Sequence, residues 1–481
     1  MKNLALPGNP RYQPKQPQAF FGYDNLFRGV AELEIATLET LGEIGVIPKE
    51  EMDLLTPEIK YRLVEAITTT EVDVVEREVT GHDIRAWVRI AQEILPLPLC
   101  RWLHLFLTSY DPLDTVRTLQ FSRAHQSIVQ PQTEQVIRIL CGLVRKFAKT
   151  VQIGRTHGQH AIPITVGFWL ATILSRILWN LEEANRFADR LVGKVSGAVG
   201  ACNAQMALGI TKRCGSVDFE KRVLTKLGLK PARISTQIVP PEPLHYYLFS
   251  IVMLTGAFGQ LGRDCRHLMR SEIGEIEEPR SKGQVSSSTM GHKRNPVTWE
   301  GIVRAYLATK KEFIGGVLET VISDHQRDLE GSGLMRDFPT IVVNLTLQLN
   351  ALLRVKESVG VSFLEGMVVN EEACKRNLAL PGDSILAEPL YIALQMAGYQ
   401  GDAHKLINEE VMPVFLEQRG ASLFQIVRNQ LALQGQQSIW NAIPSEVLEL
   451  FSRGPQAYVG NAEAKALQIA DLAEAYLSKA T

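Results

Sequence analysis

The chain has 481 residues, which is long enough to form more than one hydrophobic core. Its 51 basic residues balance 52 acidic ones, so the overall charge favours neither nucleic acid nor an anionic membrane surface as a partner. An anionic ligand would have to be bound by a local cluster of basic side chains.

The cysteines and the N-terminal stretch both bear on where the protein is located. The cysteines are scattered, form no Cys-x-x-Cys pair, and several lie in apolar helical patterns, so we interpret them as reduced core residues. The stretch MKNLALPGNPRYQP has too short an apolar run for a signal peptide. We therefore expect a cytoplasmic protein. The six cysteines are Cys100, Cys141, Cys202, Cys214, Cys265 and Cys374.

Several long segments predict helices, taken here in chain order. Residues 115–130 predict a helix that Pro131 interrupts and that resumes beyond it. Residues 168–192 contain neither proline nor glycine and predict a second long helix. Residues 340–359 are apolar almost all round, which is typical of a helix buried among other helices.

Two breaks divide this helical pattern into three parts. They lie near residues 108–112 and near residues 370–381, and candidate strands are few throughout. We therefore predict an all-α protein with a central bundle of long helices and a smaller helical domain at each end. The predicted domains are residues 1–111, 112–368 and 369–481.

One segment tests whether the chain enters a membrane. Seventeen uncharged residues, YYLFSIVMLTGAFGQLG, lie between His245 and Arg263, which is at the lower limit for a membrane span. The segment includes polar residues and glycines, and the helical periodicity continues beyond it. We interpret it as a buried core helix, with a membrane span as the alternative.

The common nucleotide and metal motifs are missing from the sequence. No Gly-x-Gly-x-x-Gly opens a helix after a strand, and there is no P-loop. His157 and His160 form a His-x-x-His pair, but no carboxylate or cysteine accompanies them at metal-ligand spacing. We therefore predict neither a metal nor a cofactor.

The most informative stretch is SSSTMGHKRNPVTWE, residues 286–300. Two glycines bracket its serines, and Asn295 followed by Pro296 predicts the start of a helix. Lys293 beside a helix N-terminus favours an anion, and a serine hydroxyl nearby could act on what is bound there. The alternative, typical of loops with this composition, is a solvated segment without function.

This stretch resembles the signature loop of the fumarase/aspartase superfamily, whose common form is Gly-Ser-Ser-x-Met-Pro-x-Lys-x-Asn-Pro. Within it the chain is most similar to the adenylosuccinate lyase family, over nearly its whole length. The resemblance implies the all-α fold of the fumarase/aspartase type, a homotetramer whose active sites draw on three subunits, and a β-elimination that releases fumarate. The other similar segments, in the family's order, are NPRYQP, EIGVIPKEE, GHDIRAWV, HLFLTSYDPLDT, IGRTHGQHAIPIT, KVSGAVG, ISTQI and HQRDLEGSGLMR.

Such an elimination needs a base, an acid for the departing nitrogen, and cations that hold a carboxylate as it takes its aci form. The resemblance implies Ser287 as the base and His157 as the acid. Lys293 and Asn295 would hold the aci-carboxylate. A serine is a poor base unless its alkoxide is stabilised, and Lys293 and the helix N-terminus are plausible stabilisers. Without the motif, His157 would be only a hydrogen-bonding residue of a glycine-rich turn.

The resemblance also implies residues that bind the succinyl part of a substrate. Thr108 and Ser109 would bind a carboxylate, although these residue types also favour turns for purely local reasons. Gln237 would supply an amide, and His82 and Asp83 would contact the substrate. Of the remaining histidines, we interpret His104 as a core residue and His160 as structural.

A phosphate clamp would distinguish a nucleotide substrate from other succinyl conjugates. Guanidinium groups match phosphate geometry, whereas any single arginine is more typical of a charged surface. We therefore expect adenylosuccinate, which would be converted to AMP, or the related succinyl-carboxamide nucleotide of purine biosynthesis. The residues implied by the resemblance are Arg11, Tyr12, Arg327, Ser332 and Arg336.

The chain departs from the family pattern at five positions. Ser286 and Gly291 replace the signature Gly and Pro, and Phe106, Gly301 and His325 replace a small residue, an Asn and a Trp. Because of these changes, the resemblance does not determine which base and sugar the substrate carries. Two alternatives therefore remain. One is a superfamily lyase that acts on a different aminosuccinate-type substrate, and the other is a structural or binding protein that retained the fold without turnover.

Overall fold

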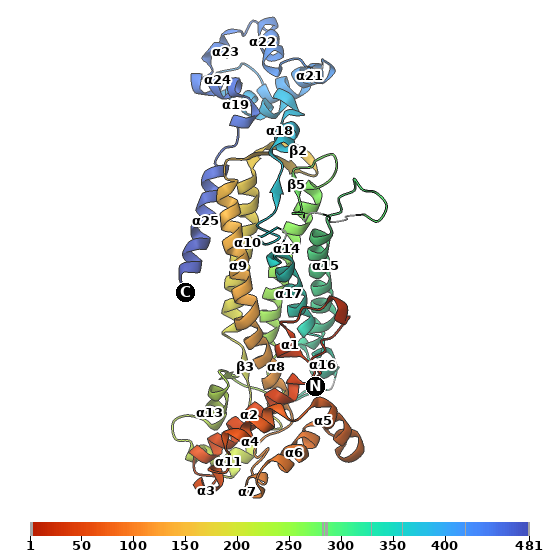
Figure 1. The fold of residues 1–481 in the computed structure, drawn as a ribbon. Coiled ribbons are helices and arrows are strands. Elements are labelled where there is room, and N and C mark those ends of the chain that lie inside the picture. The colour runs from red at the N-terminus through yellow and green to blue at the C-terminus, as the bar shows by residue number, and fades with distance from the viewer. Residues whose placement is uncertain are drawn as a thin grey trace. The chain divides into compact units, whose positions relative to one another are not determined.

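The computed structural model describes residues 3–280, 283, 287–328, 330–357, 359–418 and 420–479. The protein is all-α with a few short strands, which confirms the predicted fold class (Figure 1). The chain forms two compact units, which we call unit 1 and unit 2. Unit 1 comprises Met1–Val136, Arg176–Gly262 and Thr298–Arg354, and unit 2 comprises Ile137–Ser175, Arg263–Val297 and Val355–Thr481. The division into three domains stays a prediction.

The helices and strands have the following bounds. The helices of unit 1 are α1 (Gln18–Phe21), α2 (Asn25–Glu43), α3 (Lys49–Met52), α4 (Pro57–Glu65), α5 (Thr69–Val75), α6 (Asp83–Ile94), α7 (Leu97–Cys100), α8 (Tyr110–Ala124), α11 (Asn203–Ala207), α12 (Ile210–Arg213), α13 (Phe219–Lys226), α16 (Glu330–Leu334) and α17 (Pro339–Leu353). Those of unit 2 are α18 (Glu371–Ala379), α19 (Ala387–Met396), α20 (Ala403–Lys405), α21 (Met412–Glu417), α22 (Leu423–Leu433), α23 (Ser438–Ala442), α24 (Ser445–Arg453) and α25 (Ala462–Lys479). Helices with residues in both units are α9 (Gln130–Lys146), α10 (Val166–Ala188), α14 (Glu242–Leu268) and α15 (Val297–Glu312). The 3-10 and π-helical segments are η1 (Pro10–Tyr12), η2 (Glu76–Thr80), η3 (His125–Val129), η4 (Phe313–Val317), η5 (Leu318–Val321), η6 (Gly382–Leu386), η7 (Leu406–Val411) and η8 (Pro455–Ala457). The strands are β1 (Val151–Thr156), β2 (Gln159–Thr165), β3 (Val192–Gly193), β4 (Lys230–Pro231), β5 (Ile276–Glu277) and β6 (Val368–Val369).

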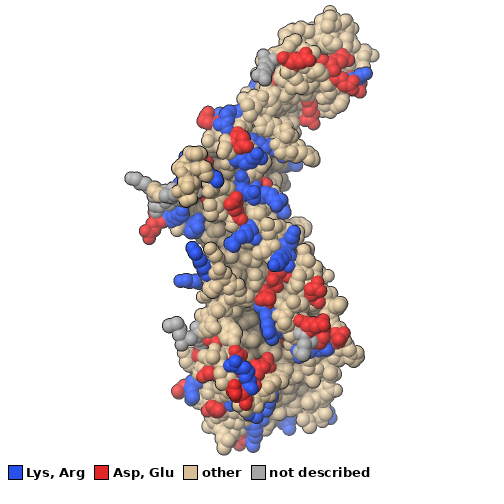
Figure 2. Space-filling view, turned by 90° about the vertical axis from the view of Figure 1, so that its right-hand side faces the viewer, with Lys and Arg blue, Asp and Glu red and all other residues tan. Residues whose placement is uncertain are grey.

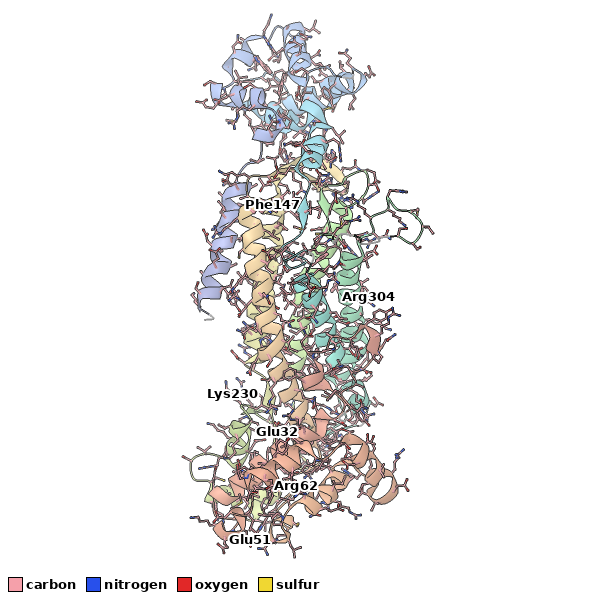
Figure 3. All side chains as sticks on the ribbon, in the orientation of Figure 1. Glu32, Glu51, Arg62, Phe147, Lys230 and Arg304 are labelled. Carbon is pink, nitrogen blue, oxygen red and sulfur yellow. The ribbon has the colours of Figure 1, made fainter. Side chains whose placement is uncertain are left out.

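The core of unit 1 forms around α2, which contacts α4, α8 and α13. A Cβ atom at Gly29 would lie 2.4 Å from Cγ1 of Val116, so only glycine lets α2 and α8 approach this closely. Glu51 of α3, labelled in Figure 3, accepts hydrogen bonds from Arg101 and from the Trp102 indole at 2.5 and 2.6 Å. These contacts give the segment before residue 108 a fixed support.

The apolar helix predicted at residues 340–359 is α17, which ends earlier, at Leu353. None of its described side chains is exposed. Within unit 1 the amide of Gln348 donates to the carbonyl oxygens of Thr255 and Ile302 at 3.1 and 2.8 Å. The protein's own helices therefore cover α17, and its apolar surface by itself does not call for a second copy of the chain.

The helix predicted at residues 115–130 begins earlier, at Tyr110, and Pro131 does not interrupt it. A π-helical turn, η3, lies directly before this proline. In a regular helix the ring of Pro131 would clash with the carbonyl group four residues earlier, and the wider π turn relieves this clash. A local widening of the helix therefore takes the place of the expected break.

Helix α14 contains the uncharged segment that raised the question of a membrane. Among the described residues it is the one helix that is long and apolar enough to cross a bilayer. Its most apolar stretch is 67% buried inside the protein. That degree of burial favours the core-helix interpretation. Basic and acidic side chains both occur on the face shown in Figure 2, in keeping with the balanced composition.

Unit 2 contains an antiparallel hairpin, β1–β2, and a separate C-terminal core. Helix α18 packs on β1, where Ile153 of the strand joins Leu378 and Ile385 in a small buried cluster. The C-terminal core is formed by side chains from η6 to α24. The hairpin is therefore supported by residues far away in the sequence.

Candidate active site

All four predicted catalytic residues belong to unit 2. His157 lies in the two-residue turn of the β1–β2 hairpin, between the paired residues Thr156 and Gln159. Its φ of +53° and that of Gly158, +78°, are both positive, as a tight hairpin turn requires. The turn presents the imidazole at the exposed tip of the hairpin. The exposed position suits a group that must reach a ligand.

The signature loop brings Ser287 into a turn of its own. The Ser287 hydroxyl oxygen accepts hydrogen bonds from the main-chain N–H groups of Thr289 and Met290 at 3.4 and 3.0 Å. Lys293 is exposed and Asn295 is half-buried, directly before α15. The helix begins at Val297, within two residues of the predicted start. Ser286 lies outside the described residues.

The ten predicted substrate-binding residues belong to unit 1. Three of them, from distant parts of the sequence, form one cluster. The Arg327 guanidinium donates to the Gln237 amide oxygen at 3.0 Å and to the Ser332 hydroxyl at 3.1 Å. Its central carbon lies 3.3 Å from the ring centroid of Tyr110, a cation–π contact. The Tyr110 hydroxyl is also hydrogen-bonded to Ser332. The fold thus unites residues that are 90 positions apart in the chain.

Thr108 and Ser109 form the turn that leads into α8. Ser109 occupies the N-cap position but makes no side-chain capping bond. The main-chain N–H of Thr108 donates to the Asp111 carboxylate at 2.7 Å, and Asp111 is also paired with Lys194. Both charged side chains are fully buried, and Asp111 additionally accepts the N–H of Ser196 at 3.0 Å. A buried ion pair therefore sets the shape of the turn and leaves its hydroxyls available to a ligand.

A second group of predicted residues surrounds Glu76. Burial raises the pKa of Glu76, the charges of Asp83 and Asp73 raise it further, and His82 and Arg336 lower it, so these side chains share one neighbourhood. The imidazole of His82 lies 3.1 Å from the Asp83 carboxylate, and both side chains are exposed. Arg336 is exposed as well. This side of unit 1 therefore mixes acidic and basic groups.

Arg11 and Tyr12 are less closely tied to the other predicted ligands. They lie in η1, where the Arg11 guanidinium carbon is 5.4 Å from the ring centroid of Tyr12. Both are exposed, and Tyr12 retains 53% of its accessible surface. Neither contacts Arg327 or Ser332 among the hydrogen bonds and ring contacts between described residues, so their place in a phosphate clamp stays a prediction.

Two non-glycine residues before this turn have left-handed backbone angles. The φ values are +60° at His104 and +64° at Phe106, a region that such side chains rarely adopt. His104 Nδ1 lies 2.7 Å from the Glu34 carboxylate, which also accepts the main-chain N–H of His104 at 2.9 Å. His104 is therefore a core residue with a partner, as expected, and the strain next to Thr108 is of the kind found at functional sites.

A cavity of about 60 Å³ borders the same cluster and is lined by Tyr110, Ser332 and His245 among others. Burial lowers the pKa of His245 to about 4, although Glu242 raises it, so this histidine is neutral at pH 7. Its Nε2 atom lies 3.0 Å from the Thr320 hydroxyl. A neutral, hydrogen-bonded imidazole is a poor acid, so His245 supports the site without being a second proton donor.

The second histidine of the His-x-x-His pair, His160, lies on β2 of the same hairpin. Burial lowers the pKa of His160, with Arg155 as the next cause, so its ring lies beside a cation. Over the described part of the chain no three His, Cys, Asp or Glu side chains are grouped as metal ligands would be.

Three residues that support the candidate site were missed by sequence reasoning. Tyr110 holds the Arg327 guanidinium, and Asp111 and Lys194 shape the turn at Thr108. All three belong to segments that the family resemblance had singled out, HLFLTSYDPLDT and KVSGAVG. Nothing in their residue types indicated that the two segments meet, because a buried ion pair is formed only when the fold brings its members together.

Known proteins resemble this chain in sequence and in fold. Residues 55–307 match the Lyase family. The chain is 32% identical to adenylosuccinate lyase of Pyrococcus abyssi (strain GE5 / Orsay) over 87% of this chain and 88% of the relative. It is 30% identical to N-acetyl-S-(2-succino)cysteine lyase of Dickeya dadantii (strain 3937) over 87% of each. The crystal structure of fumarate lyase from Mesorhizobium sp. BNC1 superposes with a TM-score of 0.78 at 21% identity, over 97% of this chain and 100% of that one.

Proposed function

Because the chain belongs to the lyase family that contains the adenylosuccinate lyases, within the fumarase/aspartase superfamily, we propose that it cleaves adenylosuccinate to AMP and fumarate. The reaction breaks a C–N bond by β-elimination. The related succinyl-carboxamide nucleotide of purine biosynthesis is a second expected substrate, since it has the same succinyl group on nitrogen. The proposed mechanism uses side chains and main-chain groups only.

The observation that carries the proposal is the cluster around Arg327. Its guanidinium is held by Gln237, by Ser332 and by the face of Tyr110, next to the Thr108–Ser109 turn. The acceptors of its hydrogen bonds are neutral, although its charge also acts on the buried Asp114 carboxylate and opposes the rise in the pKa of that group. A guanidinium that is not hydrogen-bonded to a carboxylate can donate N–H groups to an anionic ligand. This arrangement supports a site for a substrate with several anionic groups.

In the proposed mechanism Ser287 removes the proton next to the substrate carboxylate. A serine hydroxyl does this only if its alkoxide is stabilised. The two main-chain N–H groups that point at the Ser287 oxygen would strengthen their hydrogen bonds as that oxygen becomes negative. Lys293 and Asn295 would hold the carboxylate in its aci form. These roles are proposals that rest on the position of the loop before α15.

His157 would then donate a proton to the departing nitrogen. The hairpin turn places this imidazole at the end of a hydrogen-bonded two-stranded element rather than on a long loop. A proton donor must lie within hydrogen-bond reach of the leaving group, and a rigid support improves that alignment. The elimination is complete when the C–N bond breaks and fumarate and AMP leave.

The first test is direct. Purified protein should convert adenylosuccinate to AMP with the release of an equal amount of fumarate. The loss of adenylosuccinate absorbance and the appearance of fumarate are followed together, so that a contaminating hydrolase is distinguished from a lyase. A protein that releases fumarate only from other succinyl conjugates would overturn the substrate assignment and retain the elimination.

A second candidate substrate follows from one relative and from the departures in sequence. The Dickeya dadantii protein of similar identity is named for a succinylated cysteine, in which the succinyl group is bonded to sulfur. A superfamily lyase that acts on such a conjugate would need the carboxylate-binding turn but no phosphate clamp. The same fumarate measurement with N-acetyl-S-(2-succino)cysteine as substrate decides between the two.

A cytoplasmic location also fits the proposed function. All six cysteines are free thiols, and four of them are buried. Free buried thiols are typical of proteins from a reducing compartment. The location remains a prediction.

We further propose that the chain assembles as a homotetramer that shares its active sites between subunits. Support comes from one apolar stripe on α14, formed by Tyr246, Phe249 and Met253, which are 55%, 46% and 44% exposed. Their spacing of three and four residues puts them on one face of the helix. Trp179 on α10 is 68% exposed as well. Exposed aromatic side chains of this kind mark surfaces that another subunit covers.

Charge placed on this stripe should break the assembly. We expect the wild-type protein to have about four times the chain mass of 53.6 kDa, and the double variant Tyr246→Glu, Phe249→Glu to have a lower mass. Light scattering at micromolar concentration measures both. The control is Tyr61→Glu, since Tyr61 on α4 is 68% exposed and lies outside the stripe. A wild-type protein that is monomeric would rule out the tetramer.

A further inference from the structure

Glu275 is a fully buried carboxylate to which none of the proposed catalytic steps assigns a role. It receives four hydrogen bonds from side chains of unit 2. Oε1 accepts from Arg155 Nη2 at 2.6 Å and from Asn377 Nδ2 at 2.7 Å. Oε2 accepts from Gln152 Nε2 at 2.7 Å and from Arg155 Nη1 at 3.0 Å. Both oxygens therefore have two donors, and the contact with Arg155 is bidentate.

Two of the three donor residues belong to the strand that leads to His157. Gln152 and Arg155 lie on β1, and Arg155 pairs with His160 across the hairpin. The β1–β2 register also shifts between Ile153 and Arg155, which weakens the regular pairing at that point. The end of the hairpin is therefore held by the buried carboxylate as well as by its own ladder.

The main chain of Glu275 fixes a second segment. Its N–H donates to Leu268 at 3.0 Å, and its carbonyl accepts from Asn370 at 2.9 Å. The next two residues form β5, which pairs with β6, and Arg294 returns to Glu277 with an ion pair of 2.5 Å. Residue 275 therefore also lies at the base of the segment that carries Ser287 and Lys293.

A purely structural role is the simplest alternative. The bidentate pair of Arg155 with Glu275 could serve only to join the hairpin to the segment before β5 and, through Asn377, to α18, whose Leu378 packs against Ile153. The donor from α18, Asn377, contributes to that junction, since it also donates to the Ile273 carbonyl at 2.9 Å. The two donors from β1 have a different position, because they precede the turn at His157 by only a few residues. Strand β1 begins just beyond the end of α9, which Phe147 marks in Figure 3. Without these two donors only the β1–β2 ladder, with its register shift, would hold the far end of the strand.

We infer that Glu275 is a positioning residue, which aligns the turn bearing His157 through Gln152 and Arg155 and fixes the base of the segment bearing Ser287. The inference rests on the proposed function, because alignment is required only if His157 transfers a proton. A carboxylate with four donors has one orientation, whereas a neutral amide at that position would have to turn one N–H toward Arg155. The hairpin end would then move away from its place by a fraction of an ångström or more.

The test is Glu275→Gln, which retains the size of the side chain and removes its charge. We expect kcat to fall by about 10- to 100-fold, with KM changed little, since misalignment of a reacting group by about 1 Å can cost that much. In a protein that already has His157→Gln, the same change should lower the residual kcat by less than about 2-fold. A group that acts through His157 has no further effect once His157 is absent.

Two milder variants serve as a matched pair and guard against failure to fold. Gln152→Met and Asn377→Leu each remove one neutral amide donor from the same carboxylate, the first from the hairpin side and the second from the α18 side. We expect Gln152→Met to lower kcat and Asn377→Leu to lower only the melting temperature. Amide hydrogen exchange over residues 151–165 should become faster in Gln152→Met and in Glu275→Gln, and stay unchanged in Asn377→Leu.

The outcomes separate the inference from the function on which it depends. Glu275 would have only a structural role if Glu275→Gln lowered kcat by the same factor in the wild type and in His157→Gln. The same conclusion would follow if Gln152→Met and Asn377→Leu had equal effects on kcat and on hydrogen exchange. If the wild type releases no fumarate from any succinyl conjugate, the proposed function fails. The exchange measurement then decides by itself whether Glu275 holds the hairpin, and unchanged exchange in Glu275→Gln would refute that too.

Discussion

The variant Ser287→Ala should lose at least ~10²-fold in kcat, the lower end of what a general base contributes. The substrate should still bind, because the change removes one hydroxyl from a turn in unit 2 and leaves the predicted ligand residues of unit 1 untouched. Steady-state fumarate release gives kcat, and equilibrium titration of the variant with substrate gives the affinity. The combination of lost turnover and retained affinity is what identifies a catalytic group.

The neighbouring serine supplies the control for this result. Ser288 is exposed next to Ser287, so Ser288→Ala makes the same chemical change one residue further along. It lacks the two main-chain donors that point at the Ser287 oxygen, and we expect its kcat to stay close to wild type. If Ser288→Ala were inactive and Ser287→Ala active, the base would be the second serine and the alignment with the signature loop would be shifted by one residue.

Removing the phosphate from the substrate should lower kcat/KM by roughly 10²–10⁴-fold. Hydrogen bonds to a charged group contribute about 1.5–3 kcal/mol each, and the loss of two corresponds to that range at about 1.4 kcal/mol per factor of ten. Part of the loss should be in kcat, since remote binding energy helps to align the reacting groups. The measurement compares adenylosuccinate with its nucleoside form in the wild-type protein.

Arg336 is the residue to replace in order to test where the protein binds the phosphate. Arg327 is engaged by Gln237, Ser332 and Tyr110, so its replacement would also disturb the cluster. Arg336 is exposed, and its replacement is expected to change charge more than structure. If Arg336 contacts the phosphate, the kcat/KM values for adenylosuccinate and for its nucleoside form should differ less in Arg336→Ala than in the wild type.

An exposed arginine elsewhere in unit 1 provides the comparison for Arg336→Ala. Arg62 on α4, labelled in Figure 3, is suitable because it is exposed. In Arg62→Ala the ratio of kcat/KM for the nucleotide to kcat/KM for the nucleoside should be the same as in the wild type. Equal kcat/KM for nucleotide and nucleoside in the wild type would remove the nucleotide assignment. The elimination would survive that result, and the succinylated cysteine would become the better candidate.

Much of the fold followed from local sequence patterns. The long helices, the absence of regular strand–helix alternation and the helix start after Asn295 depend on periodicity, on proline and on capping residues, which act within a few residues of one another. The errors were local as well. Pro131 was expected to interrupt a helix, and the structure absorbs it in the π turn η3, because the choice between a break and a wider turn depends on the packing around His125 and Ile128.

The identities of the candidate site residues also came from the sequence alone. Ser287, Lys293 and His157 stand in short segments that resemble the family's motifs in the family's order. The resemblance implied their roles without knowledge of their positions in space, and these roles stay predictions. We interpreted His104 as a core residue because its neighbours in the sequence are apolar. The contact of His104 with the Glu34 carboxylate agrees with that interpretation.

Only the tertiary structure decided which of these residues support one another. Three contacts join positions that are 83 to 123 residues apart in the chain. They are the hydrogen bond from Arg327 to Gln237, the ion pair of Asp111 with Lys194, and the hydrogen bonds to Glu275, among which Asn377 is 102 residues away. A buried charge is tolerated only when the fold supplies its partners, and the identity of those partners depends on which helices pack together rather than on local pattern. Sequence, through the family resemblance, therefore predicted the chemical groups of the candidate site, whereas packing determined how these groups are held in place.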